Sequence, residues 1–137
     1  MSLELYAFVD RLPDRPIWQT AIDQTGFDLK LDPDLDLSGD EGFSPCQIQG
    51  KASGFEIDVM PAAELLHEYP DLIPTVGARL HVVCFRWGGD FAEAACALVA
   101  SLALARNLGS IVYDPEERVV CEVASLEEEI RQCLAQL

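Results

Sequence analysis

The sequence has few basic residues. Nine Lys and Arg stand against 24 Asp and Glu, so the formal net charge is −15 at pH 7. Such a chain repels nucleic-acid phosphates and lacks the attraction that supplies most non-specific affinity for DNA. We therefore expect no direct nucleic-acid ligand. The same field would attract a basic protein partner and speed its association, although acidity can also serve solubility alone.

Membrane and export signals are also missing. The N-terminus has no basic stretch followed by an apolar run, as a secretory signal would. The longest apolar run, residues 91–105, is interrupted by Glu93 and Ser101. It is also shorter than the roughly 20 residues that a membrane-spanning helix needs. These features predict a cytoplasmic protein that makes no membrane contact.

The cysteines do not form a recognisable framework. There are five, an odd number, and no C-x-x-C pair occurs. Cys84, Cys96 and Cys133 fall at apolar positions of their predicted elements. This placement favours buried, reduced thiols over disulfides or zinc ligands.

No motif specific for a catalytic or cofactor site occurs: there is no G-x-S-x-G, Walker loop or G-x-G-x-x-G. Residues 34–39 match the opening of an EF-hand calcium loop, but Pro45 occupies the twelfth position, where a bidentate Glu is needed. His67 has no second histidine at helical spacing, so a zinc motif is not supported. We expect no metal and no cofactor.

Hydrophobic periodicity predicts an α+β fold in one domain, residues 1–137. A hairpin within residues 45–60, with residues 50–53 as its connection, requires antiparallel pairing. The expected architecture is a mixed or antiparallel sheet of about five to seven strands, packed against a central alanine-rich helix and two or three other helices. The predicted strands are residues 3–9, 27–31, 45–49, 54–60, 78–87, 110–113 and 118–123, and the predicted helices are residues 15–25, 62–69, 90–108 and 125–137.

The alanine-rich helix organises this prediction. Asp90 and Glu93 have the spacing of a capping box, and Gly88-Gly89 forms a tight turn before it. Ser125 is predicted to cap the last helix, whose buried stripe is then Leu126, Ile130, Cys133, Leu134 and Leu137.

The same turn offers an alternative site. His81, Arg86, Asp90 and Glu93 could bind a metal or exchange protons, as in a small metal-dependent hydrolase. However, His81 and Arg86 are five residues apart on a strand and so face opposite sides, and capping already explains both acids. The structural interpretation is favoured, and the hydrolase stays as the alternative.

The most acidic segment is residues 32–42, which we predict to be a solvated loop. Loops carry a disproportionate share of binding residues, so this loop is the predicted surface for a basic partner. Its candidate partner-binding residues are Asp32, Asp34, Asp36, Asp40 and Glu41.

Three blocks carry a resemblance: Gly54-Phe55-Glu56, Phe85-Arg86-Trp87-Gly88-Gly89-Asp90 and Val112-Tyr113-Asp114-Pro115. They resemble those of a group of small, acidic, uncharacterised bacterial proteins. The size, acidity and lack of catalytic motifs are similar to those of immunity proteins that neutralise a toxin. The resemblance implies a non-catalytic protein-binding module with a basic toxin as partner, and it leaves homo-oligomerisation open.

Overall fold

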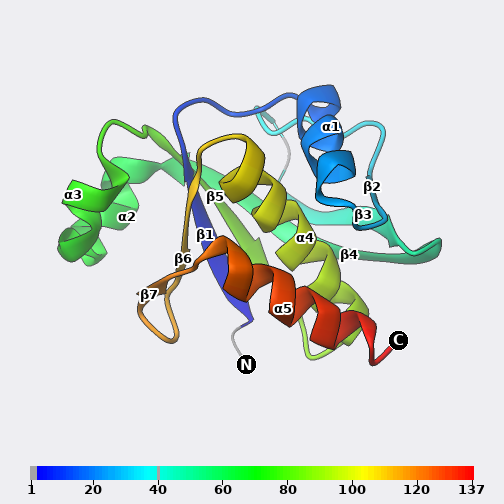
Figure 1. Cartoon of the computed structure of the whole chain (residues 1–137). Helices are drawn as coiled ribbons and strands as arrows, with labels where there is room; N and C mark the ends of the chain where they lie inside the picture. The colour runs from blue at the N-terminus through cyan, green and yellow to red at the C-terminus, as the bar shows by residue number, and fades with distance from the viewer. Residues whose placement is uncertain (1–2, 40) are drawn as a thin grey trace.

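A computed structural model describes residues 3–39 and 41–137. Within these residues, seven strands form one sheet and the helices pack against it (Figure 1). The strands are β1 (Glu4–Val9), β2 (Leu29–Leu31), β3 (Gly42–Ile48), β4 (Lys51–Pro61), β5 (His81–Arg86), β6 (Ile111–Asp114) and β7 (Val119–Val120). The helices are α1 (Arg15–Thr25), α2 (Ala62–Glu68), the 3-10 helix η1 (Pro70–Leu72), α3 (Ile73–Val76), α4 (Phe91–Asn107) and α5 (Val123–Leu134).

The strand order is β2-β3-β4-β5-β1-β6-β7, and every neighbouring pair is antiparallel. The α+β class is therefore confirmed, with an antiparallel rather than a mixed sheet. None of the described helices is long and apolar enough to cross a bilayer.

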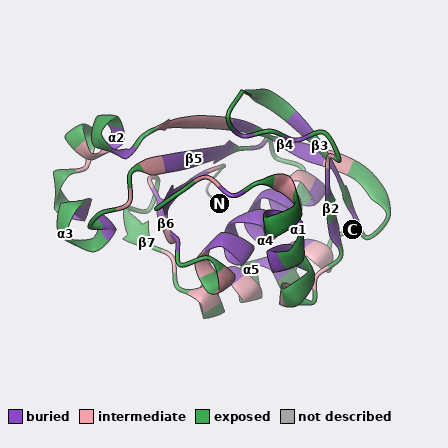
Figure 2. Cartoon of the chain, turned by 90° about the horizontal axis from the view of Figure 1, so that it is seen from above, coloured by how far each residue is buried: buried purple, intermediate pink, exposed green. Residues whose placement is uncertain are grey.

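The alanine-rich helix α4 is the centre of the larger core. It lies against one face of the sheet with α1 on one side and α5 on the other, and Figure 2 shows it buried between these two helices. Every residue from Ala94 to Leu104 is buried. Small side chains let the neighbouring backbones approach closely on several sides, as predicted from the alanine content.

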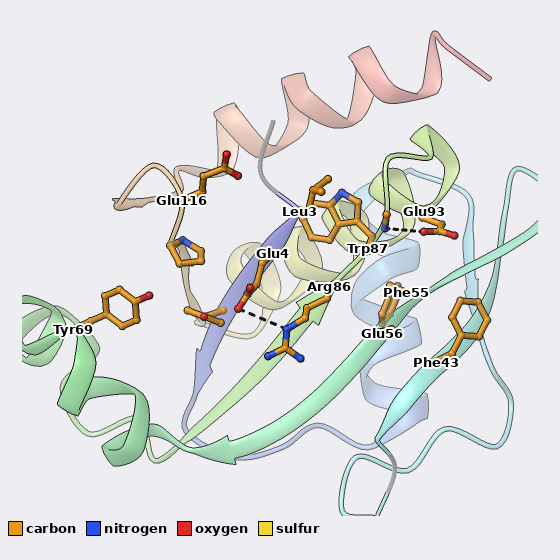
Figure 3. Close-up of a pocket in the computed structure, with 13 residues that line it drawn as sticks. Leu3, Glu4, Phe43, Phe55, Glu56, Tyr69, Arg86, Trp87, Glu93 and Glu116 are labelled. Carbon is orange, nitrogen blue, oxygen red and sulfur yellow. Dashed lines mark hydrogen bonds and ion pairs between the residues drawn. The ribbon is translucent and has the colours of Figure 1, made fainter.

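The opposite face of the sheet is only partly covered. Alternate residues of β1 face different sides: Leu5 belongs to the α4 core, whereas Tyr6 and Phe8 pack in a second cluster with Leu65 of α2 and Val76 of α3. The short helices α2 and α3 lie at one end of this face (Figure 1). On this face, no helix among the described residues packs over the end of the sheet that carries Glu4 and Arg86 (Figure 3).

The β3–β4 hairpin turns earlier than predicted. Gln49 and Gly50 form its tip with φ of 51° and 76°, the left-handed pair that a type I′ turn requires. Residues 51–53, predicted as part of the connection, instead belong to β4. The sequence prediction was wrong here because a non-glycine residue, Gln49, adopts a positive φ.

The acidic segment is less solvated than predicted. Asp34 and Asp36 are exposed and Asp32 is half-buried, but Leu35 and Leu37 are buried and join the main core. The loop is therefore fixed to the domain by alternating leucines, and β3 already begins at Gly42. Asp40 lies outside the described residues.

The C-terminal helix starts one turn earlier than its predicted cap. Glu122 occupies the N-cap position of α5 without a side-chain hydrogen bond, so Ser125 lies inside the helix and does not cap it. Leu126, Ile130 and Cys133 are buried as predicted, but Leu137 is 40% exposed and is not part of the stripe. The helix ends at Leu134, before the chain can bring Leu137 back to the core.

Candidate functional site

A groove of about 810 Å³ lies on the uncovered part of the sheet (Figure 3). Its floor lies on the face opposite α4, where β1, β5 and β4 run side by side, and its rim extends to Phe55, Trp87 and Glu93 on the α4 side. Its lining residues are Leu3, Glu4, Tyr6, Phe43, Phe55, Glu56, Tyr69, Arg86, Trp87, Gly88, Glu93, Pro115 and Glu116.

The floor of the groove is a row of side chains that crosses the strands. Phe43 pairs with Glu56, Glu56 with Arg86, and Arg86 with Glu4. Residues directly opposite one another on antiparallel strands project to the same face of the sheet. The row therefore reads aromatic, negative, positive, negative from β3 to β1.

Arg86 is held loosely in this row. Its Nε lies 3.8 Å from Oε1 of Glu4, and the two side chains are 46% and 32% exposed. Ion pairs at this exposure contribute little to stability. Glu56, on the other side of Arg86, forms no salt bridge with any described residue. The floor thus contains one weakly paired carboxylate and one unpaired carboxylate.

Tyr6 supports Glu4 from the floor. Its side chain is hydrogen-bonded to that of Glu4, and burial followed by the nearby carboxylate raises the pKa of Tyr6. The phenol therefore remains protonated and donates to Glu4 throughout the physiological pH range. This bond orients the Glu4 side chain in the floor of the groove.

The rim adds further negative charge. Glu93 of α4 accepts a hydrogen bond from the Gly88 amide at 3.0 Å, and Glu116 lies on the turn between β6 and β7. Among the described residues, the lining thus contains four glutamates and one arginine. Carboxylates converging on a concave surface concentrate the protein's negative field there.

Trp87 closes one end of the groove. It is 8% exposed, and its Nε1 is buried with no hydrogen-bond partner among the described residues. Trp87 packs in the core cluster on the α4 side of the sheet, and Leu3 lines the same groove. A buried N–H without an acceptor is destabilising, so this donor is an unusual feature of the site.

The alternative hydrolase residues are not brought together. Asp90 caps α4 by accepting from the amides of Ala92 at 2.6 Å and Glu93 at 3.4 Å, as predicted. Arg86 lies in the groove, but His81 begins the strand that Arg86 ends, about 16 Å away at about 3.3 Å per residue. The described chain contains no group of three His, Cys, Asp or Glu residues that could hold a metal ion.

The described residues of the acidic loop do not line the groove. Asp32 accepts from the amide of Asp34 at 3.0 Å, and Asp36 accepts from the amide of Ser38 at 3.0 Å and from its hydroxyl at 2.6 Å. The Ser38 hydrogen bonds lower the pKa of Asp36. The loop packs beside the start of α1, and Glu41 then leads into β3, two residues before Phe43.

The five cysteines are free thiols. Cys84, Cys96 and Cys133 are buried, as predicted. Burial, the largest effect, raises the pKa of Cys84 to about 12. This thiol is therefore protonated at neutral pH and does not act as a nucleophile.

No family model, curated protein or solved structure matches the chain. The groove must therefore be interpreted from its own geometry. Sequence reasoning had placed Arg86 and Glu93 in the alternative site but missed Glu4, Glu56 and Glu116. These residues come from separate strands and a turn, and only the strand register brings them together.

Proposed function

We propose that the protein is a non-catalytic binding module that captures a basic protein segment in the groove. The observation that carries this proposal is the convergence of four carboxylates and exposed aromatic surface on one concave, uncovered part of the sheet. Charge complementarity of this kind steers association and excludes partners of the wrong sign. The nearest concrete form is an immunity-type protein that neutralises a basic toxin, in keeping with the resemblance above.

An anionic ligand is a poorer fit to the same groove. Arg86 is the only basic residue among the described residues of the lining, and its cross-strand neighbours on both sides are Glu4 and Glu56. An anion approaching Arg86 would meet both carboxylates at close range, in addition to the net charge of −15. A cation meets attraction from the same groups.

The acidic loop is a second contact surface in this proposal. It carries the predicted residues Asp32, Asp34, Asp36, Asp40 and Glu41, and it joins β3 next to the Phe43 end of the groove. Since Leu35 and Leu37 hold the loop against the core, the exposed Asp34 and Asp36 are presented in a fixed arrangement. A partner that fills the groove beyond Phe43 would meet this negative surface next.

Affinity capture from an extract of the native cells tests the proposal. The wild-type protein should retain a basic polypeptide that is released by raised salt, because exposed charge pairs are screened. Glu4→Gln with Glu56→Gln should retain much less of it. As a control, Glu127→Gln with Glu128→Gln removes two charges from α5, on the other side of the sheet, and should capture normally.

Mass spectrometry of the retained proteins measures the outcome. Equal retention of the same polypeptide by the groove variant and the α5 variant would contradict the proposal. Retention of acidic polypeptides only would also contradict it, since the groove then has no part in choosing a basic partner.

A further inference from the structure

We propose that Cys46 and Cys96 form a redox-active thiol pair, which a hydroperoxide such as hydrogen peroxide oxidises to a disulfide between β3 and α4. The proposal goes beyond the proposed function and does not depend on it. The pair lies behind the Phe43 end of the groove, because Cys96 is hydrogen-bonded to Gly54 and the ring of Phe43 covers that glycine.

The strand register and the core packing bring the two cysteines together. Cys46 on β3 lies opposite Ser53 on β4, so both side chains project to the same face of the sheet. Cys46 and Ile48, the next inward residue of β3, belong to the core cluster that contains Cys96 of α4. Cys46 is 5% exposed and Cys96 is fully buried. The two thiols are therefore enclosed on the α4 side of the sheet.

Three groups hydrogen-bond to the sulfur of Cys96: the side chains of Cys46 and Ser53 and the backbone amide of Gly54. The hydrogen bond with Cys46, the largest effect, lowers the pKa of Cys96, while burial opposes it and the other two bonds add to it. The same hydrogen bond raises the pKa of Cys46, and burial acts in the same direction. Cys96 is therefore the thiol that ionises first, and Cys46 keeps its proton.

The proton of Cys46 has two acceptors. Besides Cys96, the carbonyl oxygen of Ser44 lies 3.7 Å from the Cys46 sulfur and accepts from it. A thiolate carries a full charge, and hydrogen bonds to charged groups are stronger than those to neutral ones. Once Cys96 is ionised, the Cys46 proton is therefore shared with Cys96, and the two sulfurs are in contact when Cys96 is nucleophilic.

The other three cysteines lack this arrangement. Burial raises the pKa of Cys84 and that of Cys121 to about 12, and it also raises the pKa of Cys133. No second thiol among the described residues contributes to these shifts. Thiols of this kind stay protonated near neutral pH and react slowly with oxidants. They are internal controls for the proposed pair.

A surface hollow of about 420 Å³ gives an oxidant access to the pair. Cys46 and Ser53, two of the groups that hydrogen-bond to Cys96, also line this hollow. Leu31 and Asp32, at the end of the edge strand β2, line it as well. One layer of side chains therefore separates the hollow from Cys96, and hydrogen peroxide is only slightly larger than water.

Oxidation of the pair takes two steps. The Cys96 thiolate attacks one oxygen of the peroxide, so that an S–O bond forms, the O–O bond breaks and the departing hydroxide takes a proton from solvent to become water. The Cys46 sulfur then attacks the sulfenic sulfur, an S–S bond forms, and the sulfenic oxygen leaves with the Cys46 proton as a second water. The two sulfurs lose two electrons in total, and the peroxide gains them.

Peptide mapping of the wild-type protein after treatment with one equivalent of hydrogen peroxide tests the inference. Trypsin places each cysteine in a different peptide, with Cys46 in residues 31–51 and Cys96 in residues 87–106. We expect these two peptides to be linked, and dithiothreitol to separate them. Alkylation of the remaining thiols after unfolding should show that Cys96 is oxidised at least about tenfold faster than Cys84.

Two variants test the roles of the two sulfurs. Cys46→Ser should stop at the sulfenic acid of Cys96, which dimedone labels, whereas Cys84→Ala, the matched control, should still form the linked peptides. Recovery of Cys46 and Cys96 as free thiols from the treated wild-type protein would overturn the inference, and this result does not depend on whether a variant folds. A sulfenic acid on wild-type Cys96 without the disulfide would overturn it too, as would oxidation of Cys84 or Cys121 at the rate of Cys96.

Discussion

Gly54→Ala is expected to lower the free energy of unfolding by roughly 2–4 kcal/mol. Gly54 has φ of +154°, and an added Cβ would collide with the carbonyl oxygen of Ser44 and with the ring of Phe43. The ring of Phe43 covers this glycine, much as aromatic side chains cover glycines in other strands. The substitution should therefore also displace Phe43 from the groove and weaken partner binding.

Gly89→Ala is the matched control. An added Cβ there would have no atom within 4 Å, and Gly89 does not adopt a positive φ. The free energy of unfolding of the Gly89→Ala variant should stay within about 0.5 kcal/mol of that of the wild type. Urea denaturation of both variants gives the comparison. Equal losses would show that the close contact at Gly54 is not the cause, and a large loss at Gly89 alone would mean that the turn before α4 needs its glycine.

Glu56→Lys should slow association with the captured basic partner by roughly 10-fold to 100-fold at low salt. The substitution replaces the unpaired carboxylate of the groove floor with a second cation beside Arg86. Arg86→Gln should act in the opposite direction and raise the association rate, because it removes the positive charge at the centre of the groove floor. Surface plasmon resonance at two ionic strengths measures both effects, which should shrink as salt rises.

A second charge reversal distinguishes the effect of a charge in the groove from the effect of the protein's net charge. Glu128→Lys on α5 changes the total charge by the same amount, at a side chain that is 61% exposed on the other side of the sheet. We expect it to slow association only slightly. If Glu56→Lys and Glu128→Lys slow association equally, the partner responds to overall acidity and the groove has no special part.

Elements with strong local signals were predictable from sequence. Helix α1 spans Arg15–Thr25 as predicted, because Asp14 caps the amide of Ile17 at 2.9 Å and Gly26 ends the helix with φ of 84°. Helix α4 was predictable for the same reason, because Asp90 caps its first turn. Such signals lie within a few residues of the helix end, so they can be recognised in a short stretch of sequence.

Long-range arrangement was not predictable in the same way. The strand order places β1 between β5 and β6, far from its sequence neighbour β2. This order alone brings Glu4 beside Arg86, and no local pattern encodes it. The acidic loop is a different case: leucine alternates with aspartate over residues 34–37, but so short an alternation does not distinguish a solvated loop from one whose Leu35 and Leu37 are buried.

The most direct test of the acidic groove is an NMR titration of the ¹⁵N-labelled protein with the captured basic partner. The largest amide shifts should fall on Glu4, Glu56, Arg86 and Trp87, with smaller ones on residues 34–39 if the loop is a second contact. Shifts confined to the outer surfaces of α1 and α5 would contradict the account, because these helices lie across the sheet from the groove. Shifts on residues 34–39 without shifts on the groove residues would indicate that the partner binds the acidic loop alone.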